Sequence, residues 1–232
     1  MARLIARRGA LRLLAAAPFG IALHGCAGSP SGMDGGLDGG ADPGDAALGD
    51  AALGDVDGGG CQPSQADALG PFFEDGSPAR MMLAEAGEPG ERLLVEGTLR
   101  SAARCDRGLE GYVLDVWQAD AEGNYHSGPG HRLRGRVVTG ADGGFRFETI
   151  VPGRYATGGG LRPAHLHVRV YDPAGADRLI TQLYFEGDPY LGEADSCGPP
   201  TCFSDDAARV MPTEPARVGG VDGRLARARL IV

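Results

Sequence analysis

The chain has 232 residues, including 40 glycines and 16 prolines, and carries a formal net charge of −9. It contains no lysine, so every permanently basic side chain is an arginine. This length allows one domain of good size, and the acidic balance without a basic run in the main domain argues against nucleic-acid binding.

Residues 1–26 have the pattern of an export signal. Four arginines open the segment, and the apolar run at 13–23 is too short to span a membrane comfortably. The pair Arg7-Arg8 is similar to a twin-arginine signal. Cys26 ends a lipobox-like sequence, LHGC, which predicts a lipid-modified cysteine and an envelope location. The alternatives are a plain cleaved signal or a start codon placed too far upstream.

Residues 27–60 are of low complexity. They contain seven aspartates, two GDAAL repeats and no aromatic residue. Such a composition cannot bury a core, so no structure is assigned to it. We expect a flexible acidic tether that holds the following domain off a membrane surface.

From residue 61 onward the composition becomes that of a folded domain. Seven short runs, β-branched or alternating and bounded by Gly, Asp or Pro, are typical of strands. They are residues 92–100, 111–118, 133–139, 145–150, 165–171, 179–185 and 227–232. No convincing amphipathic helix accompanies them, so residues 61–232 are predicted to be all-β, an antiparallel β-sandwich with long loops that carry a metal site. Residues 188–223 are expected to be rich in loops.

The chain contains five cysteines. With Cys26 assigned to lipid, four remain, and an even number in an exported protein predicts disulfides. Four cysteines allow three pairings. A local bond between Cys197 and Cys202 is sterically reasonable and would leave Cys61 with Cys105. The absence of CxxC spacing makes a zinc cluster the weaker interpretation.

Two histidines stand out in the run at 165–171. His165 and His167 are two residues apart, so in a strand they share one face while Leu166 and Val168 point to the other. With Arg162 close by in sequence, two imidazoles on one face suggest a metal site. The alternative is a solvated pair without a ligand.

Five sequence pieces carry a resemblance to a known family. They are PSQ…GPFF (63–73), VWQADAEGNY (116–125), RGRVVTGADGGFRFETIVPGRY (134–155), LRPAHLHV (161–168) and LITQLYFEGDP (179–189). In this order, over roughly residues 62–190, they resemble the intradiol ring-cleavage dioxygenases, especially the iron-bearing chain of protocatechuate 3,4-dioxygenase.

The resemblance implies a non-haem Fe(III) held by Tyr125, Tyr155, His165 and His167. Phenolates are hard anionic donors that suit ferric iron, and imidazoles bind iron as well. The implied reaction is cleavage of a catechol-type diol by O2 to a muconate-type diacid. The implied partners are therefore a small aromatic diol and O2, and the resemblance is compatible with a homodimer.

The resemblance also implies roles around the metal. Tyr155 would leave the metal and accept a substrate proton, and Arg162 would stabilise negative charge that develops on the ring. Gln182 matches a family position near the metal, where it would support the ligands. Trp117 is expected to be a core or lining residue, and Tyr184 a core aromatic.

A second family interpretation stays open. The turn-and-strand pattern also resembles transthyretin-like and carboxypeptidase-regulatory β-sandwich modules, which bind at cell surfaces without catalysis. Those modules have no need of the four ligands and Arg162, so their joint presence favours the enzyme. A third alternative is a site that binds a metal without turnover.

Export suggests action on aromatic compounds outside the cytoplasm.

Overall fold

The computed structural model describes residues 62–232. The predictions for the signal, Cys26, the tether and Cys61 lie outside the described residues. The strands are β1 (Arg92–Ser101), β2 (Arg104–Gly108), β3 (Val113–Gln118), β4 (Arg134–Val138), β5 (Gly144–Ile150), β6 (Tyr155–Thr157), β7 (Gly160–Arg162), β8 (His165–Tyr171), β9 (Asp177–Phe185), β10 (Val210–Met211), β11 (Thr213–Val218) and β12 (Val221–Ile231). Two 3-10 helices, η1 (Gly192–Ala194) and η2 (Ala207–Arg209), complete the described part.

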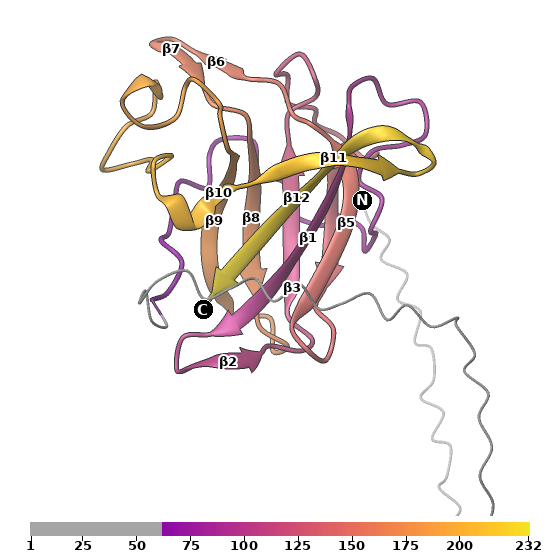
Figure 1. The fold of residues 1–232 in the computed structure, drawn as a ribbon, viewed down its shortest axis with the longest axis vertical. Helices are drawn as coiled ribbons and strands as arrows, with labels where there is room; N and C mark the ends of the chain where they lie inside the picture. The colour runs from indigo at the N-terminus through magenta and orange to yellow at the C-terminus, as the bar shows by residue number, and fades with distance from the viewer. Residues whose placement is uncertain (1–61) are drawn as a thin grey trace, which may run out of the picture. The chain divides into compact units, whose positions relative to one another are not determined.

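The strands form two five-stranded sheets and one small hairpin (Figure 1). The first sheet has the order β11-β12-β1-β2, with β5 also paired to β1; the second has the order β10-β9-β8-β3-β4; β6 pairs with β7. The predicted all-β sandwich is therefore confirmed. The sheets are mixed, because β12 runs parallel to β1 and β10 runs parallel to β9. Two parallel strands must be joined by a long crossover connection. The sequence predicted only antiparallel strands, so it did not predict these two parallel pairs.

The hydrophobic core lies between the two sheets. In β8, Leu166, Val168 and Val170 are fully buried and point inward, as the period of two requires. Inward residues from both sheets join them in the core: Leu93, Val95, Leu99, Leu114, Val116, Phe145, Phe147, Leu183, Ala226 and Leu230. This alternation leaves the odd-numbered residues of β8 on the outer face of its sheet.

The outer face of the second sheet is also covered. In the strand register His167 lies opposite Trp117 on one side and Gln182 on the other, so these three side chains share the outer face. The segment that precedes β1 crosses this face. Gly70 of that segment has φ +74°, and a Cβ there would lie 3.1 Å from Cε1 of His167. Glycine therefore permits both the turn and the close approach.

Residues 188–223 are more ordered than the sequence suggests. They hold both 3-10 helices, β10, β11 and the start of β12. These elements, together with β2 and the β6–β7 hairpin, are mostly too short to show a clear period of two. Within residues 62–232, no helix is long and apolar enough to cross a membrane.

Candidate metal centre

The four predicted ligands come together in space although they belong to three separate segments. Tyr125 follows the turn after β3, Tyr155 opens β6, and the two histidines lie on β8. The ring centroids of His165 and His167 are 4.9 Å apart, and those of Tyr125 and Tyr155 are 5.6 Å apart. The Tyr125 hydroxyl lies 3.1 Å from Nε2 of His165. The structure thus brings two phenols and two imidazoles to one place.

The turn before Tyr125 is organised by Asp120. Its Oδ1 accepts hydrogen bonds from the backbone N–H groups of Glu122 at 3.1 Å and Asn124 at 2.9 Å, and Oδ2 lies 2.7 Å from Nε2 of His126. Burial alone would raise the pKa of Asp120, but these hydrogen bonds outweigh it and lower the pKa. Aspartate side chains commonly stabilise turns by accepting hydrogen bonds from backbone N–H groups two or more residues later. Here those bonds fix the turn that places Tyr125.

Both histidines are held in the neutral form. Nδ1 of His165 lies 2.7 Å from the Pro163 carbonyl, to which it donates, so Nε2 carries the lone pair. Burial, assisted by the nearby charge of Arg162, lowers the pKa of His165 to about 4. Burial and the neighbouring His165 lower the pKa of His167 well below its usual value. Neutral imidazoles with an available nitrogen are the state that metal binding requires.

The donor set fits a ferric ion. Among residues 62–232 there is no group of three His, Cys, Asp or Glu side chains that could hold a metal, so the two phenols must complete any set built on these histidines. Burial raises the pKa of Tyr125 above its usual value, so without a cation this phenol stays protonated. Nδ1 of His167 is buried and makes no hydrogen bond of ordinary geometry in the described structure. Two nitrogens and two potential phenolates match hard, trivalent iron.

Arg162 lies beside these ligands, almost fully buried. Its Nε and Nη2 donate to the two carboxylate oxygens of Asp195 at 3.0 and 3.1 Å, and Nη1 donates to Oε1 of Gln182 at 2.9 Å. Nη2 also lies 3.2 Å from the Tyr184 hydroxyl. Burial alone would lower the pKa of Arg162, but Asp195 and Tyr184 together raise it, so the guanidinium stays charged.

Gln182 supports this arginine and contacts the chain that covers the sheet. Its Nε2 donates to the Ala68 carbonyl at 2.8 Å. In the β8–β9 register Gln182 lies opposite His167, one of the candidate ligands. Its Oε1 accepts from Arg162 and, at 3.1 Å, from the Tyr184 hydroxyl, so Gln182 contacts the candidate ligands' neighbours.

Aromatic rings pack around the candidate ligands. Phe72 stacks on Tyr125 with centroids 4.2 Å apart and meets Tyr155 edge-on at 5.5 Å. Trp117 stacks on His167 at 4.7 Å with an interplanar angle of 5°. Phe72 and Trp117 thereby hold three of the four candidate rings in place.

Tyr184 is buried, as expected of a core aromatic, and the structure adds a polar role. It is fully buried, but on the outer face rather than in the sandwich core, and its hydroxyl donates to Oδ2 of Asp67 at 2.8 Å. Asp67 also forms a 2.5 Å ion pair with Arg209. Sequence reasoning missed Asp67 and Asp195 because each lies far along the chain from the group it binds, and no motif marked them.

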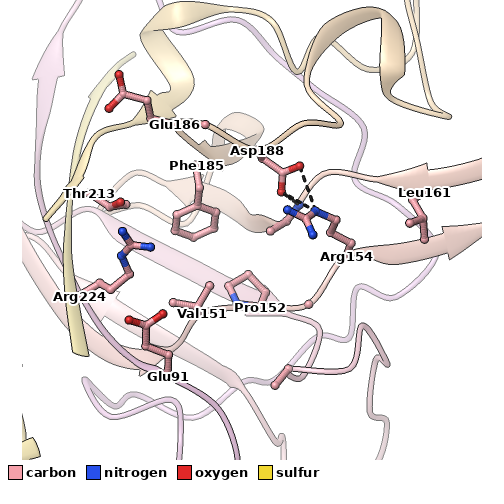
Figure 2. A pocket seen from close by; sticks show the side chains of 14 residues that line it. Glu91, Val151, Pro152, Arg154, Leu161, Phe185, Glu186, Asp188, Thr213 and Arg224 are labelled. Atoms are coloured by element: carbon pink, nitrogen blue, oxygen red, sulfur yellow. Dashed lines mark hydrogen bonds and ion pairs between the residues drawn. The ribbon is translucent and has the colours of Figure 1, made fainter. Parts of the chain in front are cut away.

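Asp188 links two ligand-bearing segments. Its carboxylate accepts from Nε of Arg154 at 3.1 Å and from the backbone N–H of Ala164 at 3.1 Å, so it connects the residue before Tyr155 with the residue before His165. Figure 2 shows the Asp188–Arg154 pair at the edge of a pocket of about 570 Å³. None of the four candidate ligands lines this pocket. Asp188 belongs to the GDP sequence at 187–189, which gave no sign of this role.

One of the two predicted disulfides lies within the described residues. Cys197 and Cys202 form a disulfide with Cα atoms 5.5 Å apart, which confirms the local pairing. Cys105 lies on β2, and its predicted partner Cys61 lies outside the described residues. That second pairing therefore stays a prediction.

Comparisons with known proteins find relatives among dioxygenases. Residues 69–197 match the family model described as "Dioxygenase". The chain is 39% identical over 153 residues to chlorocatechol 1,2-dioxygenase of Rhodococcus opacus, covering 55% of this chain and 58% of the relative. It is 36% identical over 139 residues to the protocatechuate 3,4-dioxygenase beta chain of Burkholderia cepacia, covering 54% and 57%. The chain thus spans just over half the length of these curated relatives.

A solved structure covers more of the chain. It is the dioxygenase domain of a dioxygenase carbohydrate-binding protein fusion from the cellulolytic bacterium Streptomyces sp. SirexAA-E. The similarity has a TM-score of 0.59 and 35% sequence identity, and covers 74% of this chain and 98% of that domain. The match thus extends over nearly the whole of that domain.

Proposed function

This chain belongs to the intradiol ring-cleavage dioxygenase family, and on that premise we propose that it cleaves a catechol-type diol with O2 at a non-haem Fe(III) to give a muconate-type diacid. The observation that carries the proposal is the meeting of Tyr125, Tyr155, His165 and His167 on the outer face of one sheet. The relatives' names point to catechols, chlorocatechols, hydroxyquinols and protocatechuate, which share two adjacent ring hydroxyls.

The bound ferric ion would supply Lewis acidity toward the diol oxygens. His165 and His167 would hold it through neutral nitrogens, since burial keeps both rings unprotonated. Tyr125 and Tyr155 would complete the set as phenolates. Tyr155 is only half-buried, which suits the residue proposed to accept a substrate proton at its phenolic oxygen.

Arg162 would act on the substrate through charge. Its guanidinium is fixed by Asp195 and Gln182 before substrate arrives. A preoriented cation stabilises negative charge that develops on the ring during reaction without having to reorganise. Phe72 and Trp117 would keep Tyr125 and His167 oriented by stacking.

The experiment that tests the proposal is visible absorption of the iron-loaded protein. Tyrosinate bound to Fe(III) absorbs visible light, so we expect a colour that shifts when catechol is added without O2. Admission of O2 should bleach the shifted band and release ring-opened product. Tyr112→Phe, on a tyrosine packed against the core, is the control and should keep the colour, whereas Tyr125→Phe should change it.

The other outcomes separate the alternatives. A colourless iron-loaded protein would favour the surface binding module. Colour that shifts with catechol but yields no product would indicate a metal site without turnover.

We further propose that the protein acts outside the cytoplasm, held by a lipid on Cys26. Only the sequence of residues 1–26 supports this. Intact cells should convert added catechol if it holds, whereas activity confined to cytoplasmic extract would contradict it. The homodimer stays a prediction that sedimentation of the purified protein would check.

A further inference from the structure

We propose that Asp195 positions Arg162, and that the Cys197–Cys202 disulfide keeps Asp195 in place, so that turnover depends on this cross-link. The catalytic consequence rests on the proposed function of Arg162. The contact itself does not, because it is made entirely by residues of the described chain.

The Arg162–Asp195 pair is buried and bidentate. The two side chains are 6% and 1% exposed, and two hydrogen bonds of 3.0 and 3.1 Å join the guanidinium to both carboxylate oxygens. Two parallel bonds fix the plane of a guanidinium, which one bond does not. Asp195 therefore sets the direction in which the remaining edge of Arg162 points.

Asp195 comes from a segment with little regular structure. It follows η1, and the segment rests on β7 through a hydrogen bond from the Ser196 N–H to the Leu161 carbonyl at 3.2 Å. The Oδ1 atom that binds Arg162 also accepts from the backbone N–H of Cys197 at 2.9 Å. The first cysteine of the disulfide is thus hydrogen-bonded to the carboxylate that orients Arg162.

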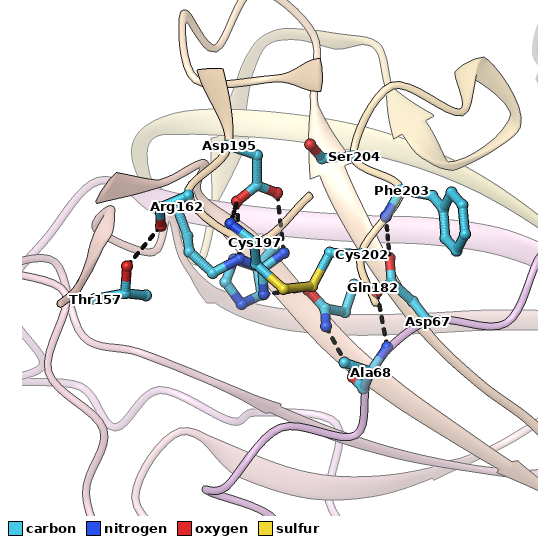
Figure 3. Close-up of a disulfide and its surroundings, with 12 residues drawn as sticks. Asp67, Ala68, Thr157, Arg162, Gln182, Asp195, Cys197, Cys202, Phe203 and Ser204 are labelled. Carbon is cyan, nitrogen blue, oxygen red and sulfur yellow. Dashed lines mark hydrogen bonds and ion pairs between the residues drawn. A yellow bond between two sulfur atoms is a disulfide. The ribbon is translucent and has the colours of Figure 1, made fainter. Parts of the chain in front are cut away.

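The disulfide joins this segment to a fixed part of the fold (Figure 3). Cys202 is 1% exposed. The N–H of Phe203 lies 3.4 Å from Oδ2 of Asp67, and Oγ of Ser204 accepts from the N–H of Gly192 at 3.0 Å. Asp67 in turn binds the Tyr184 hydroxyl, which lies beside Arg162. The cross-link therefore closes a ring of contacts that begins and ends at the arginine.

Loss of the disulfide would leave hydrogen bonds alone to hold the loop that contains GPPT, among them Ser196 N–H to the Leu161 carbonyl and Phe203 N–H to Asp67. Removing a cross-link raises the number of conformations open to the segment, and an aspartate on a looser segment orients its partner less well. Because Arg162 is proposed to act on charge that develops during reaction, its misorientation should lower kcat more than it raises KM.

Two variants of the full-length, iron-loaded protein test the inference. Cys197→Ser/Cys202→Ser removes the cross-link and keeps the contact residues; Asp195→Asn keeps the cross-link and removes the charge. For each we expect kcat to fall by about 10- to 100-fold, the range found when groups that orient a metal-site residue are changed, with KM within about threefold. Asp115→Asn is the control, because Asp115 is another buried partner of an arginine on the same sheet, 2.9 Å from Arg136. Its kcat should stay within about threefold.

A second readout needs neither iron nor turnover. In 15N-labelled apo-protein the Nε–H of Arg162, bonded to a buried carboxylate, should exchange slowly with solvent. Its protection should fall in Asp195→Asn, which keeps one acceptor oxygen but loses the charge, and in the double cysteine variant, and should stay unchanged in Asp115→Asn.

The outcomes are distinct. Retention of both kcat and Arg162 protection in the double cysteine variant would overturn the role of the disulfide, and the same result in Asp195→Asn would overturn the whole inference. Should the cysteine variant fail to fold, Asp195→Asn decides the role of Asp195. The role of the cross-link is then tested on the native protein: mild reduction should lower the protection of the Arg162 Nε–H, and reoxidation should restore it. Should the native protein cleave no catechol, the proposed function fails, and the exchange measurement still decides the positioning.

Discussion

The two faces of the β10-β9-β8-β3-β4 sheet are stabilised by different interactions. On the inner face of β8, Leu166, Val168 and Val170 contribute buried apolar area to the sandwich core. On the outer face of the same strand, His165 and His167 meet phenols, a stacked indole and a buried guanidinium network. One strand therefore serves stability and the site at the same time, on alternate residues.

This contrast shows which changes each face tolerates. Apolar burial is non-directional and scales with area, so the inner face loses stability gradually when atoms are removed. The outer face depends on particular donors and acceptors in particular places, so a small change there can abolish function while the fold survives. Adjacent residues of β8 should separate the two effects.

The largest effect is expected for His167→Gln. The amide lacks the imidazole nitrogen, so iron content and visible colour should fall sharply and turnover should drop to background. The melting temperature of the metal-free protein should fall less than in a core truncation, because glutamine fills much of the imidazole's space, although the ring stack on Trp117 is lost. Metal analysis, absorption and calorimetry would check this. Full iron content with normal turnover would remove His167 from the ligand set.

The neighbouring change Leu166→Ala should do the reverse. Leu166 is fully buried in the core, and such truncations cost about 2–5 kcal/mol in the free energy of unfolding. With about 2–4 °C per kcal/mol for a domain of this size, the melting temperature should fall by roughly 4–20 °C. Iron content and kcat, measured well below that temperature, should stay close to those of the native protein. Loss of iron in the folded variant would show that the faces are not independent.

A smaller effect is expected for Asp188→Asn, because this change should affect both the stability of the fold and the position of the candidate ligands. The asparagine keeps one acceptor oxygen but loses the charge opposite Arg154, whose side chain is 44% exposed and therefore screened by solvent. We expect a loss of about 1–2 kcal/mol in urea unfolding and a shift of the visible band, because the segments before Tyr155 and His165 lose their common partner.

The matched control for this variant is Glu96→Gln. It breaks the exposed ion pair with Arg146, made at 2.6 Å on the other sheet, and should cost less than about 1 kcal/mol without a spectral change. An Asp188→Asn protein that unfolds at the native urea concentration with an unshifted band would show that Asp188 does not restrain the ligands.

The local sequence pattern predicted most of the longer strands and which of their residues face the core. The run at 165–171 coincides with β8, and its period of two correctly separated the histidines from the core residues. The family resemblance named the four side chains that converge. β10 and β2, of two and five residues, were not predicted, because neither shows a clear period of two.

Long-range pairing was beyond the same reasoning. Asp195 lies 33 residues from Arg162, and Asp67 lies 117 residues from Tyr184. An aspartate in a polar stretch has many potential partners, and only the folded chain selects one. The parallel register of β1 with β12 was hidden for the same reason, because periodicity shows which face a strand buries but not which strand lies beside it.

That parallel register has a consequence for the synthesis of the protein. β12 pairs with β1 along nine positions, from Arg92 opposite Gly223 to Arg100 opposite Ile231. A growing chain makes β1 more than a hundred residues before this neighbour exists, so one edge of β1 stays open for about half of translation. Open strand edges invite pairing with other chains, and late pairing between distant segments makes folding slow. Nascent chains should therefore need protection until β12 has left the ribosome, and products truncated before Val221 should aggregate or be degraded.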